Sequence, residues 1–281
     1  MLFFAFVFLL LLSFINLCVV DYVVWWSVFV VCTFFFIFMI KGNIFYGSLI
    51  NYYVIQEVCG YYFLVLNNWK CQFLLVMLKS GSAPFHFWLF SVLSDLKKWF
   101  LMWFLTLQKL PYFVVLVNFC SDFFFIFLFF GMIFCYYQFF ILRNYLDMLV
   151  VGSTESFNWL LFLSMFSFNE VFVVIFFYYF TMFLVISYFF NNVFNFFNWE
   201  LVMVFFNIPL SITFFLKIIL LFGGNIYSGL FYLFLLIFMP LMSLGVGCWF
   251  FFISMINYNT GVKYYDYYLF ILFFFMLLAY F

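Results

Sequence analysis

Several ionisable side chains lie inside long apolar stretches of the sequence, where a charge is expensive. A charged group costs about 2.5–3.5 kcal/mol at the centre of a membrane helix and is usually buried against a partner. These residues are Glu57, Lys79, His86, Lys109, Glu155 and Lys217. Pumps and transporters use such groups to move protons and ions, so we take these residues as the candidate chemistry of the chain.

Each of the lysines in this set lies close to a proline. The pairs are Lys79 with Pro84, Lys109 with Pro111 and Lys217 with Pro209. Proline removes a backbone donor and blocks the helical turn before it, so we expect a kinked or broken helix beside each lysine. Carbonyls freed by such a break would be available to the lysine, with or without water, as at the ion sites of transporters with discontinuous helices.

This arrangement predicts proton exchange at the lysine amines. In a low dielectric the charged form of lysine is disfavoured, so the amine gives up its proton more readily than in water. A nearby carboxylate opposes this effect, and Glu57 is the candidate acidic partner. His86 follows Lys79 by seven residues. If the helix stays regular across Pro84, the two side chains share a face and the His86 ring could relay a proton.

A purely structural interpretation of these residues is also open. Each lysine would then pair with a carboxylate only to orient two helices, and His86 would be satisfied by a backbone carbonyl.

The elements that must position these residues are membrane-spanning helices. Of the 281 residues, 72% are apolar and 6% are charged, whereas a soluble domain carries about 25% charged residues. Only helices and closed barrels satisfy their backbone inside a bilayer, and apolar runs of about 20 residues without alternating polarity favour helices. We therefore predict an all-α, polytopic integral membrane protein of about eleven transmembrane helices, two or three of them broken or kinked.

Polar residues between the apolar stretches place these spans. They cover residues 2–20, 22–40, 44–66, 71–93, 99–119, 123–142, 146–166, 171–190, 199–221, 226–252 and 264–280. The chain shows no linker and no clear repeat, so we expect residues 1–281 to form a single transmembrane domain.

Other kinds of site find no support in the sequence. The 7 cysteines are scattered without a metal-ligand spacing. The glycines match neither a dinucleotide fingerprint nor a P-loop. The formal net charge is zero and the basic residues are isolated, which argues against nucleic acid as a partner. We expect no cofactor and no metal on this chain, and membrane lipid around it.

Two segments resemble the signature of NADH dehydrogenase subunit 2, in which a K-x-G-x-A-P-F-H-F-W stretch precedes an L-T-x-Q-K element. They are KSGSAPFHFW at residues 79–88 and FLTLQKLP at residues 104–111. Weaker matches are YYVIQ at residues 52–56, STESFNW at residues 153–159 and NIPLSITFFLK at residues 207–217.

The resemblance implies an antiporter-like fold and a place in the membrane arm of respiratory complex I, in the mitochondrial inner membrane. In that family a chain of intramembrane lysines and a histidine carries protons, and Lys79, His86, Lys109 and Lys217 correspond to it by motif position. It implies a subunit of NADH:ubiquinone reductase (H+-translocating) without a redox site of its own. Other subunits would bind NAD, FMN, iron-sulfur clusters and ubiquinone. Its partners would be the other membrane-arm subunits, neighbouring antiporter-like subunits among them.

Charge in the loops predicts the orientation, because loops on the non-translocated side collect Lys and Arg. With the N-terminus on that side, Lys70 is the exception among the predicted loops, and the basic residues that follow the rule are Lys41, Lys97, Lys98, Arg143 and Lys263. We expect the N-terminus on the matrix side and the C-terminus on the opposite side.

The sequence departs from the family pattern in two places. Residues 25–32 read WWSVFVVC and lack the glutamate that usually follows a W-x-G stretch, and Asn51 stands where a lysine is common. The usual Lys and Glu pair is therefore altered, and Glu57 matches no family position. Two alternatives stay open: a stand-alone cation/proton antiporter, which transport by the purified chain in liposomes would favour, and a non-pumping scaffold subunit, which intact pumping without the central lysines would favour.

Overall fold

The computed structural model describes residues 2–41, 46–93, 96, 98–142, 145–166, 217, 218 and 241. The spans predicted after residue 166 lie outside this part of the chain, except for Lys217, Ile218 and Leu241, which are helical. The predicted count of eleven spans therefore stays a prediction.

The described residues form helices and contain no strand, which confirms the all-α class for this part of the chain. The α-helices are α1 (Leu2–Cys18), α2 (Tyr22–Ile40), α3 (Tyr46–Val65), α4 (Trp69–Ser80), α5 (Phe87–Leu93), α6 (Lys98–Leu105), α7 (Leu110–Phe119), α8 (Phe125–Ile141) and α9 (Tyr145–Phe166). Short 3-10 turns precede α7 and α8, at Leu107–Lys109 and Asp122–Phe124. The polar side chains of Asp21 and Asn68 begin α2 and α4 by accepting a hydrogen bond from the backbone two residues on.

Two of the predicted spans are interrupted at the lysines, as the prolines indicated. The span at residues 71–93 is divided into α4 and α5 by residues 81–86, and the span at residues 99–119 is divided into α6 and α7 by residues 106–109. The span at residues 146–166, despite its polar centre, is one continuous helix, α9.

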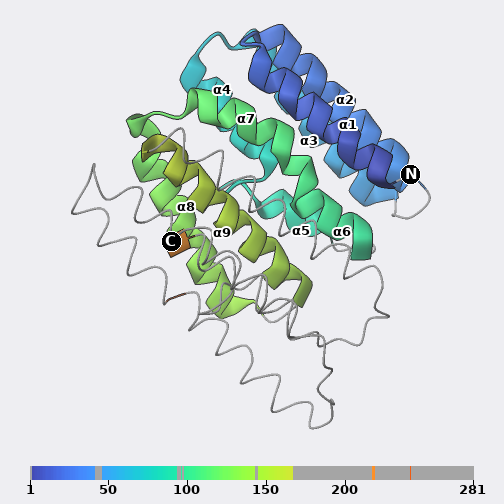
Figure 1. The fold of residues 1–281 in the computed structure, drawn as a ribbon. Coiled ribbons are helices and arrows are strands. Elements are labelled where there is room, and N and C mark those ends of the chain that lie inside the picture. The colour runs from blue at the N-terminus through green and yellow to red at the C-terminus, as the bar shows by residue number, and fades with distance from the viewer. Residues whose placement is uncertain are drawn as a thin grey trace, which may run out of the picture. The chain divides into compact units, whose positions relative to one another are not determined.

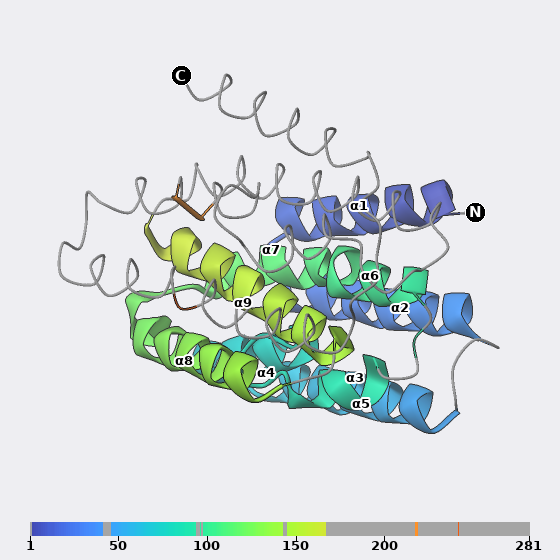
Figure 2. The ribbon, with the colours of Figure 1, turned by 90° about the horizontal axis from the view of Figure 1, so that it is seen from below.

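The chain divides into two compact units. Unit 1 contains Met1–Phe134 and Ser153–Met165, and unit 2 contains Cys135–Gly152 and Phe166–Phe281. The prediction of a single domain stays a prediction. Within unit 1, α7 lies at the centre and contacts α1, α2 and α4, while α3 packs on α2, α4 and α5 (Figures 1 and 2). The second lysine-bearing break, at the start of α7, is therefore in the middle of unit 1.

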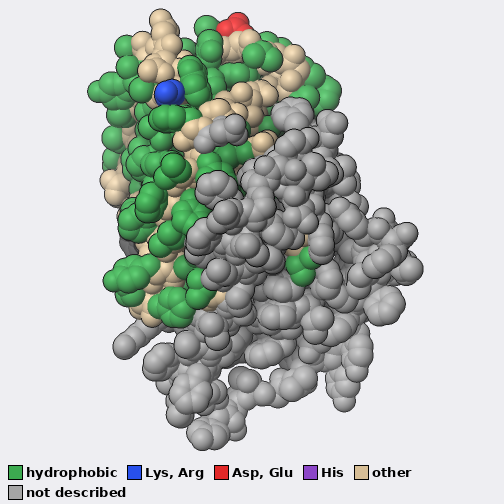
Figure 3. Space-filling model, turned by 90° about the vertical axis from the view of Figure 1, so that its left-hand side faces the viewer, with side chains coloured by type: hydrophobic (Ala, Val, Ile, Leu, Met, Phe, Trp, Pro, Cys, Tyr) green, Lys and Arg blue, Asp and Glu red, His purple; other side chains and the backbone are tan. Residues whose placement is uncertain are grey.

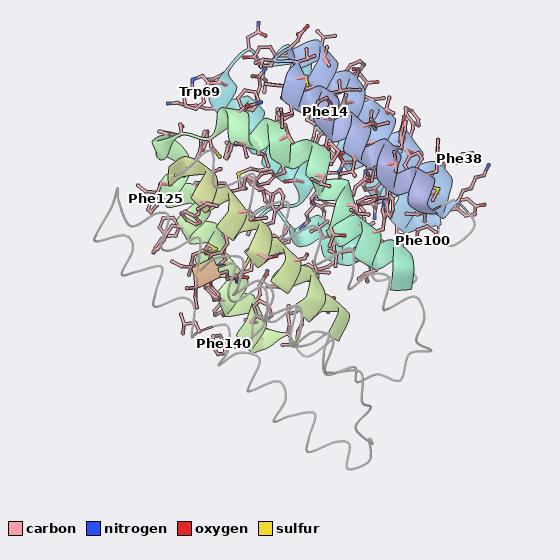
Figure 4. All side chains as sticks on the ribbon, viewed as in Figure 1. Phe14, Phe38, Trp69, Phe100, Phe125 and Phe140 are labelled. Carbon is pink, nitrogen blue, oxygen red and sulfur yellow. The ribbon has the colours of Figure 1, made fainter. Side chains whose placement is uncertain are left out.

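The outer surface of the described helices is apolar. Among the described residues that Figure 3 shows, the side chains at the surface are mostly hydrophobic, with charge at isolated points. Side chains project along the whole length of α1 and α2 (Figure 4), among them Phe14 and Phe38, which are 62% and 71% exposed. A helix that is apolar on both its buried and its exposed face suits a lipid environment rather than water.

Length and hydropathy alone qualify one described helix as a membrane span. It is α2, with a mean hydropathy of 2.5. Shorter apolar helices are Phe4–Cys18, Trp103–Phe119 and Phe125–Ile141. The break beside Lys79 leaves α4 with 12 residues and α5 with 7, which is shorter than the roughly 20 residues that a single helix needs to cross a bilayer.

Candidate functional site

The first break begins at Gly81, directly after α4. Its φ of 65° and ψ of 38° put it in the left-handed region that favours glycine. Its N–H bonds the Leu78 carbonyl and the N–H of Ser82 bonds the Met77 carbonyl, which ends the helix in a Schellman motif. A Cβ on Gly81 would also lie 2.7 Å from the side chain of Leu89. Glycine is therefore required here, and the chain turns before it reaches Pro84.

Side-chain N–H groups bind the carbonyls that this break frees. The bonds are Trp88 Nε1 to Leu78 O (3.0 Å), Gln56 Nε2 to Lys79 O (2.9 Å) and Asn158 Nδ2 to Ala83 O (3.3 Å). A free carbonyl in a membrane interior must find a donor. Neutral amide and indole groups supply it here, instead of the lysine that the sequence suggested.

The ammonium group of Lys79 is buried beside an aromatic ring. The side chain is 2% exposed, and Nζ lies 5.0 Å from the centre of the Phe29 ring, within cation–π distance. A Cβ on Gly60 would lie 3.1 Å from Nζ and 3.3 Å from Nε1 of Trp26. Because Gly60 has no side chain, α3 leaves room for the amine.

Glu57 lies near this lysine but does not form a direct ion pair with it in the described part of the chain. The charges of Glu57 and Lys79 interact. The Oε1 atom of Glu57 accepts a hydrogen bond of 3.4 Å from Thr33 Oγ1 on α2. The carboxylate of Glu57 thus points toward α2, and its role as the acidic partner of Lys79 stays a prediction.

His86 is fully buried at the start of α5. Its ring stacks on Phe87, with centroids 5.0 Å apart, and meets the ring of Phe90 edge-on at 5.8 Å. The helix does not continue from Lys79 to His86, so the seven-residue spacing does not place the two side chains on one helical face. They belong to the same helix break instead.

The second break holds Lys109, which is 3% exposed. Its Nζ donates to the carbonyl and the hydroxyl of Ser153 on α9, both at 3.4 Å, and lies 5.3 Å from the centre of the Phe157 ring. Pro111 sits in the first turn of α7, where its missing N–H costs nothing. Each of these two buried amines thus faces an aromatic ring, and each helix is interrupted beside its lysine.

The polar run in α9 supplies two site residues that were not predicted, Ser153 and Asn158, in addition to Glu155, which was among the candidate residues. Ser153 accepts a hydrogen bond from Lys109, and Asn158 donates one to the Ala83 carbonyl in the first break. Glu155, fully buried, accepts a 2.6 Å hydrogen bond from Nε1 of Trp159. The signal was visible in the sequence as the STESFNW segment inside an apolar stretch. Its partners were not visible.

Lys217 is 3% exposed, so it is buried as expected for an intramembrane lysine. It belongs to unit 2, and Pro209 lies outside the described residues. The structure therefore places Lys79 and His86 at the two ends of the first break and Lys109 at the second break of the same unit. The charge of Glu57 interacts with that of Lys79.

The sequence was compared with known proteins. No family model matches the chain. It is 44% identical over 236 residues to NADH-ubiquinone oxidoreductase chain 2 of Ascaris suum, covering 84% of this chain and 78% of that protein. It is 38% identical over 258 residues to NADH-ubiquinone oxidoreductase chain 2 of Caenorhabditis elegans, covering 92% of each. The chain belongs to the NADH-ubiquinone oxidoreductase chain 2 family. This confirms the resemblance drawn from residues 79–88 and 104–111, and the two helix breaks of this chain 2 family member fall within or beside those motifs.

Proposed function

We propose that this chain is a proton-translocating membrane subunit of respiratory complex I in the mitochondrial inner membrane. Two relatives carry the name NADH-ubiquinone oxidoreductase chain 2. Oxidation of NADH and reduction of ubiquinone would take place on other subunits, and this chain would carry protons driven by that reaction. The N-terminus would face the matrix, and its partners would be the neighbouring membrane-arm subunits.

The observation that carries the proposal is the pair of buried lysines at helix breaks. Lys79 and Lys109 are 2% and 3% exposed, and a buried ammonium costs several kcal/mol without compensation. Both amines lie beside an aromatic ring. Lys109 also donates to Ser153 over 3.4 Å, and Lys79 forms no close ion pair with any described residue. The surroundings of Lys79 therefore stabilise its charged amine only modestly, which suits a group that must take up and release a proton.

In this proposal Lys79, His86, Lys109 and Lys217 exchange protons in turn. Glu57, on α3, stabilises the charged form of Lys79. It would replace the glutamate that the family usually has in the region of residues 25–32 on α2. Ser153, bonded to Lys109, extends the polar path into α9.

Replacing Lys109 or Lys217 by methionine tests the proposal, because methionine keeps most of the volume and removes the charge. In sealed inner-membrane vesicles, each variant complex should pump fewer protons per electron than the wild type, with assembly largely intact. Lys41→Met is the matched control, since Lys41 is exposed at the end of α2. Full pumping by both Lys109→Met and Lys217→Met would refute the relay.

A further inference from the structure

A group of buried polar side chains that are not in the proton relay lies between the two helix breaks of unit 1. Its members come from α3, the 3-10 turn before α7, and α7 itself. They are Tyr52, Gln56, Gln108 and Tyr112, and each is 1% or 2% exposed. Polar groups buried this deeply are costly unless they are hydrogen-bonded, so their bonds indicate what they are there to hold.

Gln56 bonds the backbone at the first break. Its Nε2 donates to the carbonyl of Lys79 at 2.9 Å, and its Oε1 accepts from the hydroxyl of Tyr112 at 3.3 Å. Both ends of the amide are therefore used, which fixes its orientation. Through Tyr112, this contact ties the lysine-bearing end of α4 to α7.

Gln108 makes the corresponding contacts at the second break, one residue before Lys109. Its Nε2 donates to the carbonyl of Cys32 on α2 at 3.2 Å and to the hydroxyl of Tyr52 at 3.5 Å. The hydroxyls of Tyr52 and Tyr112 interact with each other. The polar contacts therefore run from the backbone of Lys79 to the residue beside Lys109.

This connection does not suit proton conduction, because an amide stands at each end. A carboxamide has separate donor and acceptor atoms and does not pass a proton on as a hydroxyl or an amine does. The hydrogen-bonded group can instead fix the positions of the two breaks. Such positioning matters because a misplacement of about 1 Å between reacting groups can lower a rate about 100-fold.

We propose that Gln56, Tyr112, Tyr52 and Gln108 are positioning residues that hold the two lysine-bearing helix breaks in register. The proposal rests on the proton-translocating role of Lys79 and Lys109. The network fixes the backbone from which each amine extends, so its loss lets the breaks shift while the helices around them stay folded.

Gln56→Leu and Tyr112→Phe test this proposal in the assembled complex, with protons pumped per electron as the readout. That ratio does not depend on the amount of complex, so a loss of stability alone does not change it. Both variants should lower the ratio by as much as Lys79→Met does. The matched control is Gln72→Leu. Gln72 is also buried, at 3% exposed, and its Nε2 donates to the carbonyl of Phe63 at 3.2 Å. This hydrogen bond does not involve either break.

The outcomes separate this proposal from the relay itself. Wild-type ratios in Gln56→Leu and Tyr112→Phe, with a lowered ratio in Lys79→Met, overturn the positioning role alone. A wild-type ratio in Lys79→Met argues against the relay. A loss in Gln72→Leu as large as that in Gln56→Leu shows that any buried amide matters equally, which also overturns the positioning role. Should Gln56→Leu fail to assemble, Tyr112→Phe decides the question, since it removes a single oxygen atom.

Discussion

A methyl group on Gly131 is expected to push against the first helix break. Gly131 is on α8, and a Cβ there would lie 2.7 Å from the carbonyl oxygen of Ala83 and 2.9 Å from its carbonyl carbon. Ordinary contact begins at 3.4 Å, so one of the two backbones must move by several tenths of an ångström. The same methyl would lie 3.1 Å from Nδ2 of Asn158, the atom that bonds the Ala83 carbonyl. Gly131→Ala therefore disturbs the break and the side chain that holds it.

The size of the effect follows from three terms. Overpacking of a close-packed site costs about 1–3 kcal/mol. A weakened Asn158 bond adds about 1 kcal/mol, because a buried carbonyl then lacks its donor. Alanine favours the helix by about 1 kcal/mol relative to glycine, which offsets part of this loss of stability. We expect a net loss of about 1–3 kcal/mol for Gly131→Ala.

The assay is thermal inactivation of NADH-driven proton uptake by the assembled complex in sealed vesicles. The control is Gly47→Ala, since a Cβ on Gly47 of α3 would meet no atom within 4 Å. Gly131→Ala should inactivate several degrees below the wild type, and Gly47→Ala should not. Equal inactivation temperatures for the two variants would show that α8 does not press on the Ala83 carbonyl as the structure indicates.

Further predictions concern the same break, the acidic partner and the orientation. Asn158→Leu leaves the Ala83 carbonyl without its donor and should lower stability by about 1–3 kcal/mol, measured by the same inactivation assay; an unchanged inactivation temperature would contradict the bond. Thr33→Val removes the 3.4 Å donor to Glu57; it should cost less than about 1 kcal/mol yet lower the protons pumped per electron, and an unchanged ratio would count against Glu57 as the partner. A protease site placed in residues 191–198 should be cut only when the matrix side is open, and cutting from the intermembrane side alone would reverse the predicted topology.

The helices and the presence of breaks could be predicted from the sequence, because both depend on local signals. The bounds predicted for α2 agree with the structure, and those predicted for α1, α3, α8 and α9 differ from it by at most two residues at either end. Pro84 and Pro111 indicated interruptions at the right segments. The position of the first break was harder to predict, because Gly81, in its left-handed conformation, ends the helix before the proline does.

The partners at the breaks could not be predicted, because they come from distant parts of the sequence. Gln56 precedes Lys79 by 23 residues and Asn158 follows Ala83 by 75 residues. Their contacts depend on how α3 and α9 pack against the break, which periodicity along one helix does not encode. The expectation that Lys79 and His86 share a face shows the same limit: it assumed a regular helix, and the break removed the regularity.

The choice of donors at the first break bears on whether Lys79 is structural or functional. A lysine that donates to the freed carbonyls would act as a helix cap, and losing its proton would weaken those hydrogen bonds. Here Gln56 and Asn158 bond the carbonyls of Lys79 and Ala83, so neutral amides satisfy the backbone. The amine donates no hydrogen bond within the described residues and faces the Phe29 ring, with the Glu57 charge nearby. Removing its proton would therefore leave the backbone bonds of the break intact. The backbone bonds of the break thus do not depend on the protonation of Lys79. A purely structural lysine does not need this independence, whereas a proton carrier does, so the arrangement favours the relay.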